Sequence, residues 1–159
     1  MNKVTMSVLS SLMGAAAGVW FVSKIERNRL NKAESTSGKF IQLFHLMNQW
    51  VNVKQDGKNL SSYLEKNNYK KIAIYGMSHV GETLLHELDG TGIEVLYGID
   101  KSAYSAHIGI NIVTPEGALD EVDAIVVTAV NFYDEIVENL KVKVNCPIIS
   151  LEDILFGGN

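Results

Sequence analysis

The sequence contains very little cysteine and proline. Its 159 residues include one cysteine, Cys146, and two prolines. A single cysteine excludes an internal disulfide and a cysteine-rich metal cluster, and it is typical of a protein from a reducing compartment. Cys146 stands next to Pro147 at the start of an apolar run, so we expect it to be a small packed residue.

Acidic residues are scarce in the first half of the chain, and basic residues are scarce in the second. Residues 1–70 carry ten Lys and Arg against four Asp and Glu, a net charge of +6. Residues 71–159 carry four Lys against fourteen Asp and Glu, a net charge of −10. Nucleic-acid backbones need clustered cations, so we expect no nucleic-acid binding by the acidic half. The basic half is the part expected to face an anionic membrane surface.

No charged residue occurs between Lys3 and Lys24. Twenty helical residues rise about 30 Å, the thickness of a bilayer's hydrocarbon core, so residues 4–23 predict a membrane anchor. Basic residues follow at once, and the positive-inside rule then places the rest of the chain in the cytoplasm, beneath the cytoplasmic membrane. Two alternatives stay open: a cleaved signal peptide, and a soluble or interfacial helix in a cytoplasmic protein.

Small residues recur every four positions in this uncharged segment, at Ser10, Gly14 and Gly18. They share one helix face, and small residues at this spacing let two membrane helices approach closely. The spacing therefore predicts self-association of the segment, although glycine and alanine are also frequent in such helices for no special reason.

A basic, amphipathic helical stalk is predicted for residues 24–68, between the hydrophobic segment 1–23 and a domain at 69–159. Six apolar side chains of the stalk share one broad helical face: Phe40, Leu43, Phe44, Met47, Trp50 and Val51. A face of this size has to be covered. Packing on its own domain, contact with a second copy in a homodimer, and contact with a membrane surface are the three alternatives.

From about residue 69 the chain alternates apolar strand-like runs with helical segments. The run DAIVVTAV, residues 123–130, is nearly continuous in apolar residues, as a buried parallel strand should be. The alternation predicts an α/β fold, a Rossmann-like doubly wound parallel sheet of about five strands in the order 3-2-1-4-5, preceded by N-terminal helices. We expect the ligand crevice beside the first strand, where the strand order reverses.

The loop after the first predicted strand, GMSHVG at residues 76–81, resembles the dinucleotide-binding fingerprint G-x-G-x-x-G. Gly76 permits a tight turn and Gly81 lets the helix pack on the sheet, but Ser78 replaces the glycine that admits a pyrophosphate. The helix amides still favour an anion, and the Ser78 hydroxyl can donate to a phosphate. The loop therefore predicts a nucleotide or nucleotide-sugar site in preference to an NAD(P) site.

Five further residues complete the predicted ligand site. Met77 and His79 belong to the loop, and His79 occupies the first helical turn, where it would contact a phosphate. Asp100 ends the second strand, where an acidic residue bonds ribose hydroxyls, although bonding to local amides explains it equally well. Thr128 and Asn131 follow the fourth strand at the same sheet edge, and Asn131 is equally suited to capping the next helix.

Four stretches, IYGMSHVG, YGID, VDAIVVTAVNFYDEI and CPIISLEDI, resemble small Rossmann-like modules of bacterial surface-polysaccharide proteins. Similar domains are the CoA-binding-like domain of membrane-bound nucleotide-sugar dehydratases and epimerases, the N-terminal domain of sugar O-acyltransferases and the C-terminal domain of sugar C-methyltransferases. The resemblance covers residues 69–155. It implies that Gly76, Ser78, Gly81 and Asp100 hold a nucleotide or nucleotide sugar.

The resemblance implies no catalytic residue. The acyltransferase pattern has its histidine one position later than His79, so no role is carried over to that residue. The sequence also shows no nucleophile–base pair, no metal cluster and no paired carboxylates. We therefore expect a non-catalytic, membrane-tethered binding module accessory to surface-polysaccharide biosynthesis. The alternatives are a scaffold protein with a vestigial pocket and a subunit of a nucleotide-sugar-modifying enzyme.

Overall fold

The structure is a computed structural model that describes residues 36–101 and 109–157. The chain divides into two compact units, Met1–Leu43 and Phe44–Asn159. The described residues of the first unit, 36–43, are helical, and helix continues in the second unit through residue 55. The division falls inside the predicted stalk, so its C-terminal part belongs to the same unit as the α/β domain.

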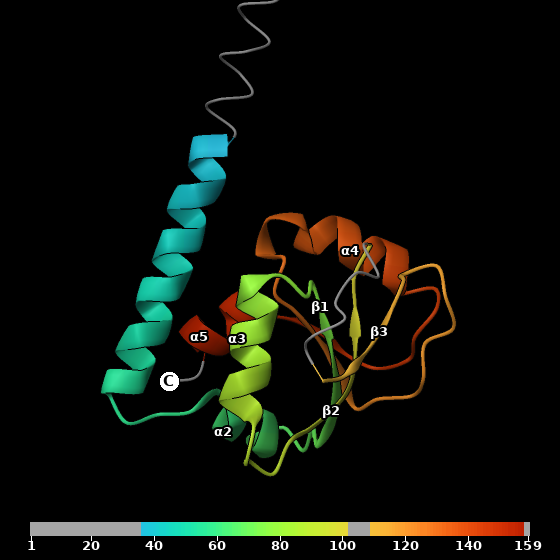
Figure 1. The fold of residues 1–159 in the computed structure, drawn as a ribbon, viewed down its shortest axis with the longest axis horizontal. Coiled ribbons are helices and arrows are strands. Elements are labelled where there is room, and N and C mark those ends of the chain that lie inside the picture. Colours follow the sequence, from blue (N-terminus) through green and yellow to red (C-terminus); the bar gives the residue numbers. More distant parts are fainter. Residues whose placement is uncertain (1–35, 102–108, 158–159) are drawn as a thin grey trace, which may run out of the picture. The chain divides into compact units, whose positions relative to one another are not determined.

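A parallel sheet forms the centre of the second unit (Figure 1). Its strands are β1 (Lys71–Tyr75), β2 (Glu94–Ile99), β3 (Asn111–Val113), β4 (Ala124–Val127) and β5 (Ile148–Ser150). The order β3-β2-β1-β4-β5, with every pairing parallel, confirms the predicted fold class and strand order. All of β4 and all but the first residue of β1 are buried, because a parallel sheet is covered on both faces.

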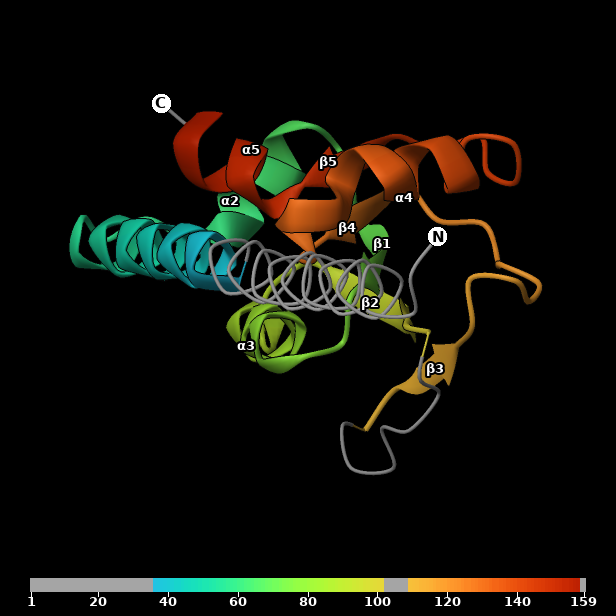
Figure 2. The ribbon, with the colours of Figure 1, turned by 90° about the horizontal axis from the view of Figure 1, so that it is seen from above.

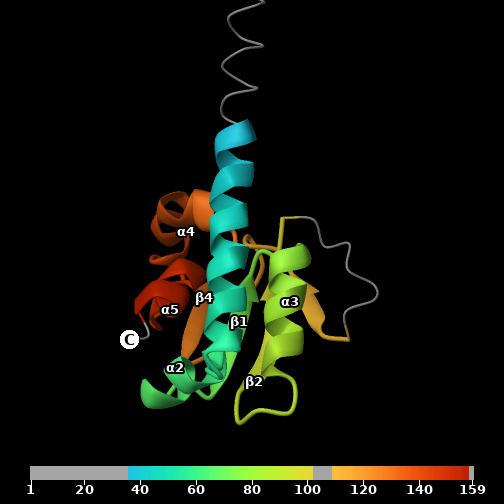
Figure 3. The same ribbon diagram turned by 90° about the vertical axis from the view of Figure 1, so that its left-hand side faces the viewer.

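Helices cover both faces of this sheet. The elements are α2 (Leu60–Lys66), α3 (His79–Leu88), the 3₁₀ turn Val130–Phe132, α4 (Tyr133–Leu140) and α5 (Leu151–Gly157). Figures 2 and 3 show α3 on one face of the sheet and α4 and α5 on the other. In α3 the buried Val80, Leu84 and Leu88 recur every four residues, so one apolar stripe faces the strands.

The core between the sheet and α4 includes side chains that carry a polar group, among them Tyr97 and Cys146. Tyr97 is buried, and its hydroxyl donates to the main-chain oxygen of Asp120 at 2.7 Å. Burial raises the pKa of Tyr97 to about 12. Cys146 packs against the same core, and burial raises the pKa of its thiol, in agreement with the packed role expected for it.

Residues 44–55 are attached to the domain by one side of their helix. Leu46 and Trp50 are buried, and Gln49 Nε2 donates to a main-chain oxygen in the last turn of α5 at 3.1 Å. Lys54 Nζ lies 2.9 Å from Glu87 Oε1 on α3. These contacts explain why this part of the predicted stalk folds with the domain.

We correct the prediction of a single N-terminal membrane span and of a location at the cytoplasmic membrane. Within residues 36–101 and 109–157, no helix is both long enough and apolar enough to cross a bilayer. The helix over residues 36–55 is long enough to cross a bilayer, but several amide side chains interrupt its apolar sequence. Residues 4–23, including the Ser10, Gly14 and Gly18 face, lie outside the described residues.

A carboxylate joins the segment before β4 to the start of β1. Asp123 Oδ2 accepts hydrogen bonds from the main-chain amides of Lys71 at 2.7 Å and Lys70 at 2.8 Å. Both hydrogen bonds lower the pKa of Asp123, and the bond from Lys71 has the larger effect. A carboxyl group with a lowered folded-state pKa adds stability above its unfolded-state pKa, and that stability is lost as the pH falls through the folded-state value.

We predict that Asp123→Asn lowers the free energy of unfolding at pH 7 and that the difference from wild type shrinks as the pH falls below about 4. Urea unfolding between pH 7 and pH 3 measures this difference. Glu121→Gln, at an exposed position two residues earlier, is the matched control and should show no comparable pH-dependent deficit. An Asp123→Asn deficit of equal size at pH 7 and pH 3 would contradict the assignment.

Candidate functional site

The turn after β1 requires a glycine at its first position. Gly76 has a φ of +96°, and a Cβ atom there would lie 2.9 Å from Thr128 Oγ1. The Thr128 hydroxyl donates to the main-chain oxygen of Gly76 at 2.6 Å and lies 3.1 Å from that of Tyr75. Thr128 therefore fastens the end of β4 to the turn after β1, and the prediction that it also contacts a ligand stays a prediction.

The second glycine of the loop is required by close packing. A Cβ atom at Gly81 would lie 2.2 Å from the main-chain oxygen of Gly76, and a backbone atom cannot move aside as a flexible side chain can. The first turn of α3 thus sits directly on the turn after β1. This close approach is the role that the fingerprint assigns to its last glycine.

Asp100 and Met77 hold the loop from the side of β2. Asp100 Oδ2 accepts a hydrogen bond from the Met77 amide at 2.8 Å, which is the local bonding that the sequence left as an alternative. The Met77 side chain is buried beneath the loop. A Cβ atom at Gly98 would lie 2.6 Å from Met77 Cγ, so the glycine in β2 makes room for this methionine. Met77 is therefore a packing residue of the loop.

Ser78 and His79 are the exposed residues of the loop. Ser78 is the N-cap residue of α3, yet its side chain makes no capping hydrogen bond. The His79 side chain is fully exposed, with Nδ1 3.7 Å from Glu82 Oε2. Because the amides of a helix's first turn carry partial positive charge, the loop combines an uncommitted hydroxyl with a surface suited to an anion.

The sheet edge beside the loop is acidic. Burial raises the pKa of Tyr75 at the end of β1, and the negative charges of Asp100, Glu116 and Glu135 raise it further. Lys101 Nζ lies 3.7 Å from Glu135 Oε1 and offsets part of this charge. The first turn of α3 is therefore the side of the loop suited to negative charge, whereas the side toward Asp100 is not.

Asn131 follows β4 at the carboxyl edge of the sheet. It is exposed in the 3₁₀ turn Val130–Phe132, and Phe132 is the N-cap residue of α4, so the alternative cap by Asn131 is not formed. Its predicted ligand contact stays a prediction. Within residues 36–101 and 109–157, no three His, Cys, Asp or Glu side chains are grouped so as to hold a metal ion.

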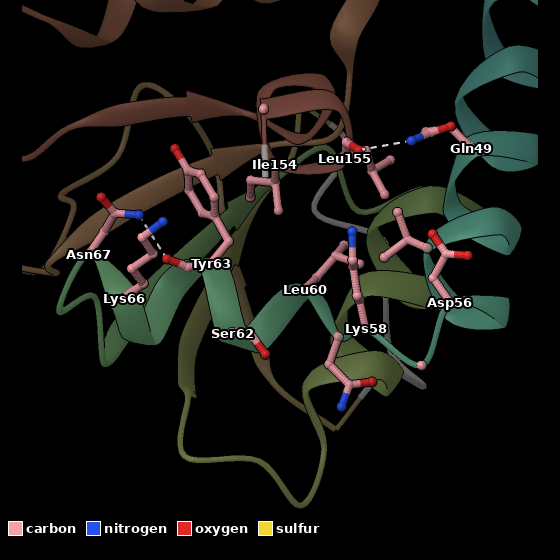
Figure 4. Close-up of a pocket in the computed structure, with 14 residues that line it drawn as sticks. Gln49, Asp56, Lys58, Leu60, Ser62, Tyr63, Lys66, Asn67, Ile154 and Leu155 are labelled. Carbon is pink, nitrogen blue, oxygen red and sulfur yellow. Dashed lines mark hydrogen bonds between the residues drawn. The ribbon is translucent and has the colours of Figure 1, made fainter. Parts of the chain in front are cut away.

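A pocket of about 510 Å³ lies away from the glycine loop, among residues 49–59, α2 and α5 (Figure 4). In Figure 4 the Lys58 side chain rises between Leu60 and Asp56, and Ile154 and Leu155 point from α5 toward α2. The sequence did not reveal this pocket, because its lining comes from three segments that share no contiguous motif.

The comparisons with known proteins place the chain in one family. Residues 68–147, just over half of the chain, match the family described as C2185-like, N-terminal. The chain belongs to this family. The C2185-like match runs from just before β1 to just before β5, so it contains the whole glycine loop, Asp100, Thr128 and Asn131. No curated protein and no solved structure matches the chain.

We predict that Gly81→Ala lowers the free energy of unfolding by about 1–3 kcal/mol, because the added methyl group pushes α3 away from the Gly76 carbonyl. Gly92→Ala is the matched control, since its Cβ would meet only Glu65 Oε1, at an ordinary 3.5 Å. That variant should stay within about 0.5 kcal/mol of wild type. Denaturant unfolding of both variants measures the difference, and equal stabilities would show that the close contact is not required.

Proposed function

We propose that the amino end of α3 binds a phosphate of a nucleotide or nucleotide sugar, and that the protein is a non-catalytic binding module. The observation that carries the proposal is Ser78. Serine at an N-cap position usually accepts a hydrogen bond from an amide of the first turn. Here its side chain makes no such bond and is exposed, which supports a role in binding a ligand together with the helix amides.

The loop geometry supports a ligand smaller than NADP. Gly76 and Gly81 give the close turn of a phosphate-binding loop, but Ser78 has a side chain where a dinucleotide pyrophosphate would need space. The carboxylates of Asp100 and Glu116 oppose a separate phosphate group on the β2 side of the loop, such as the ribose 2′-phosphate of NADP. A carboxylate accepts several hydrogen bonds, so the bond from the Met77 amide leaves Asp100 able to accept another from a ribose or sugar hydroxyl.

The biological context of the proposal is surface-polysaccharide assembly, in which this module would be an accessory binding protein. That context rests on the resemblance of the glycine loop, YGID and the β4–α4 segment to domains of polysaccharide proteins. The scaffold interpretation remains the competing function. Its support is that Thr128 and Met77, two predicted ligand residues, are engaged in packing and hydrogen bonds of the domain itself.

We predict that uridine or thymidine diphosphate, or their sugar conjugates, raise the melting temperature of the full chain. A ligand at about 100 times its dissociation constant adds about 2.7 kcal/mol, which is a shift of several degrees. Ser78→Asp should abolish the shift, because a carboxylate at this exposed position repels the phosphate. NAD, NADP and coenzyme A complete the panel and should give smaller shifts.

Ser62→Asp is the matched control. Ser62 is an exposed serine on α2 that lines the separate pocket. The proposal requires that Ser62→Asp keeps the shift while Ser78→Asp loses it. The reverse result would place the ligand in the other pocket and refute the assignment to α3. The absence of a shift with every ligand would favour the scaffold function.

A further inference from the structure

Exposed large apolar side chains concentrate on the helical residues before α2. Of the seven such side chains in the described residues, three are dispersed over the domain: Phe132, Val142 and Phe156. The other four belong to residues 36–55: Phe40, Ile41, Phe44 and Val51, each at least half exposed. Clustering of this kind marks an interaction surface more often than dispersed exposure does.

Three of the apolar residues of the second unit define a seam: Phe44, Met47 and Val51. They are spaced by three and then four residues, which is the a/d spacing of a coiled coil. In the sequence Phe40 precedes the seam by four residues and continues the pattern. Phe44 and Val51 are exposed and Met47 is half-buried, while the domain buries a neighbouring face of the helix at Leu46 and Trp50.

The charge pattern indicates which partner fits the seam. Between Phe40 and Val53 the sequence contains no Asp, Glu, Lys or Arg, although one fifth of the chain is charged. This segment, which lacks Asp, Glu, Lys and Arg, attracts neither an acidic nor a basic partner. Each copy of the chain carries a net charge of −4, and the segment from Phe40 to Val53 is where two copies can approach with little repulsion.

We propose that the seam of Phe44, Met47 and Val51 binds the same seam of a second copy of this chain. Coiled-coil spacing makes such a seam complementary to itself, since each side chain fits between four residues of an identical helix. A contact over about two helical turns buries less than the roughly 800 Å² per partner of a standard interface. We therefore expect a weak dimer that dissociates at micromolar concentrations. The seam contains no residue of the glycine loop, so this inference is independent of the proposed ligand.

Sedimentation velocity of the full chain, over about 1 to 200 μM, tests the proposal. Wild type should pass from monomer to dimer across this range. Phe44→Glu and, separately, Val51→Glu should each raise the dissociation constant at least about tenfold, because each places two like charges in one apolar seam. Val142→Glu is the matched control, since Val142 is more exposed than Phe44 and Val51 and lies beyond α4.

Each outcome decides the question. The side chains of Phe44 and Val51 are exposed, so both glutamate variants should melt at the same temperature as wild type in dilute solution. If one variant fails to fold, the other still tests the proposal. Wild type that stays monomeric at the highest concentration overturns the proposal. A dimer that both variants weaken no more than Val142→Glu does also overturns it, because the association then uses another surface.

Discussion

The candidate site depends on the contact between the α carbon of Gly81 and the main-chain oxygen of Gly76. A side chain at Gly81 would lie 2.2 Å from that oxygen, so only a glycine lets α3 begin directly against the turn after β1. The hydroxyl of Thr128 donates to the same oxygen, and Asp100 accepts from the next amide of the loop. One short turn thereby joins β1, β2, β4 and α3, and it fixes the amino end of α3 at the carboxyl edge of the sheet.

Charge then separates this edge into two regions. The first turn of α3 offers partly positive amides and the exposed Ser78 hydroxyl, whereas Asp100, Glu116 and Glu135 surround the neighbouring end of β1 and raise the pKa of Tyr75 after its burial. An anion is favoured in the first region only. We propose a ligand whose phosphates all lie at the α3 end and whose sugar hydroxyls face Asp100, in preference to a ligand with a further phosphate at its other end.

The sequence predicted the sheet and the loop because both depend on local patterns. Alternating apolar runs were enough for the order 3-2-1-4-5, and the spacing of Gly76 and Gly81 was enough for the turn. The partner of Asp100 was not predictable in the same way, since the bond to the Met77 amide depends on the register between β1 and β2. For the stalk, the sequence predicted one apolar helical face. It did not predict which residues of that face the domain buries, because the burial of Trp50 depends on tertiary packing.

The central claim is that the amino end of α3 is a phosphate site, and amide chemical shifts test it most directly. Uridine diphosphate would be titrated into the isotopically labelled full chain while two-dimensional NMR spectra follow each backbone amide. The account predicts that Ser78, His79 and Val80 show the largest, saturable shifts. Shifts centred on Lys58 and Lys66 in the separate pocket, or no saturable shift at any amide, would contradict it.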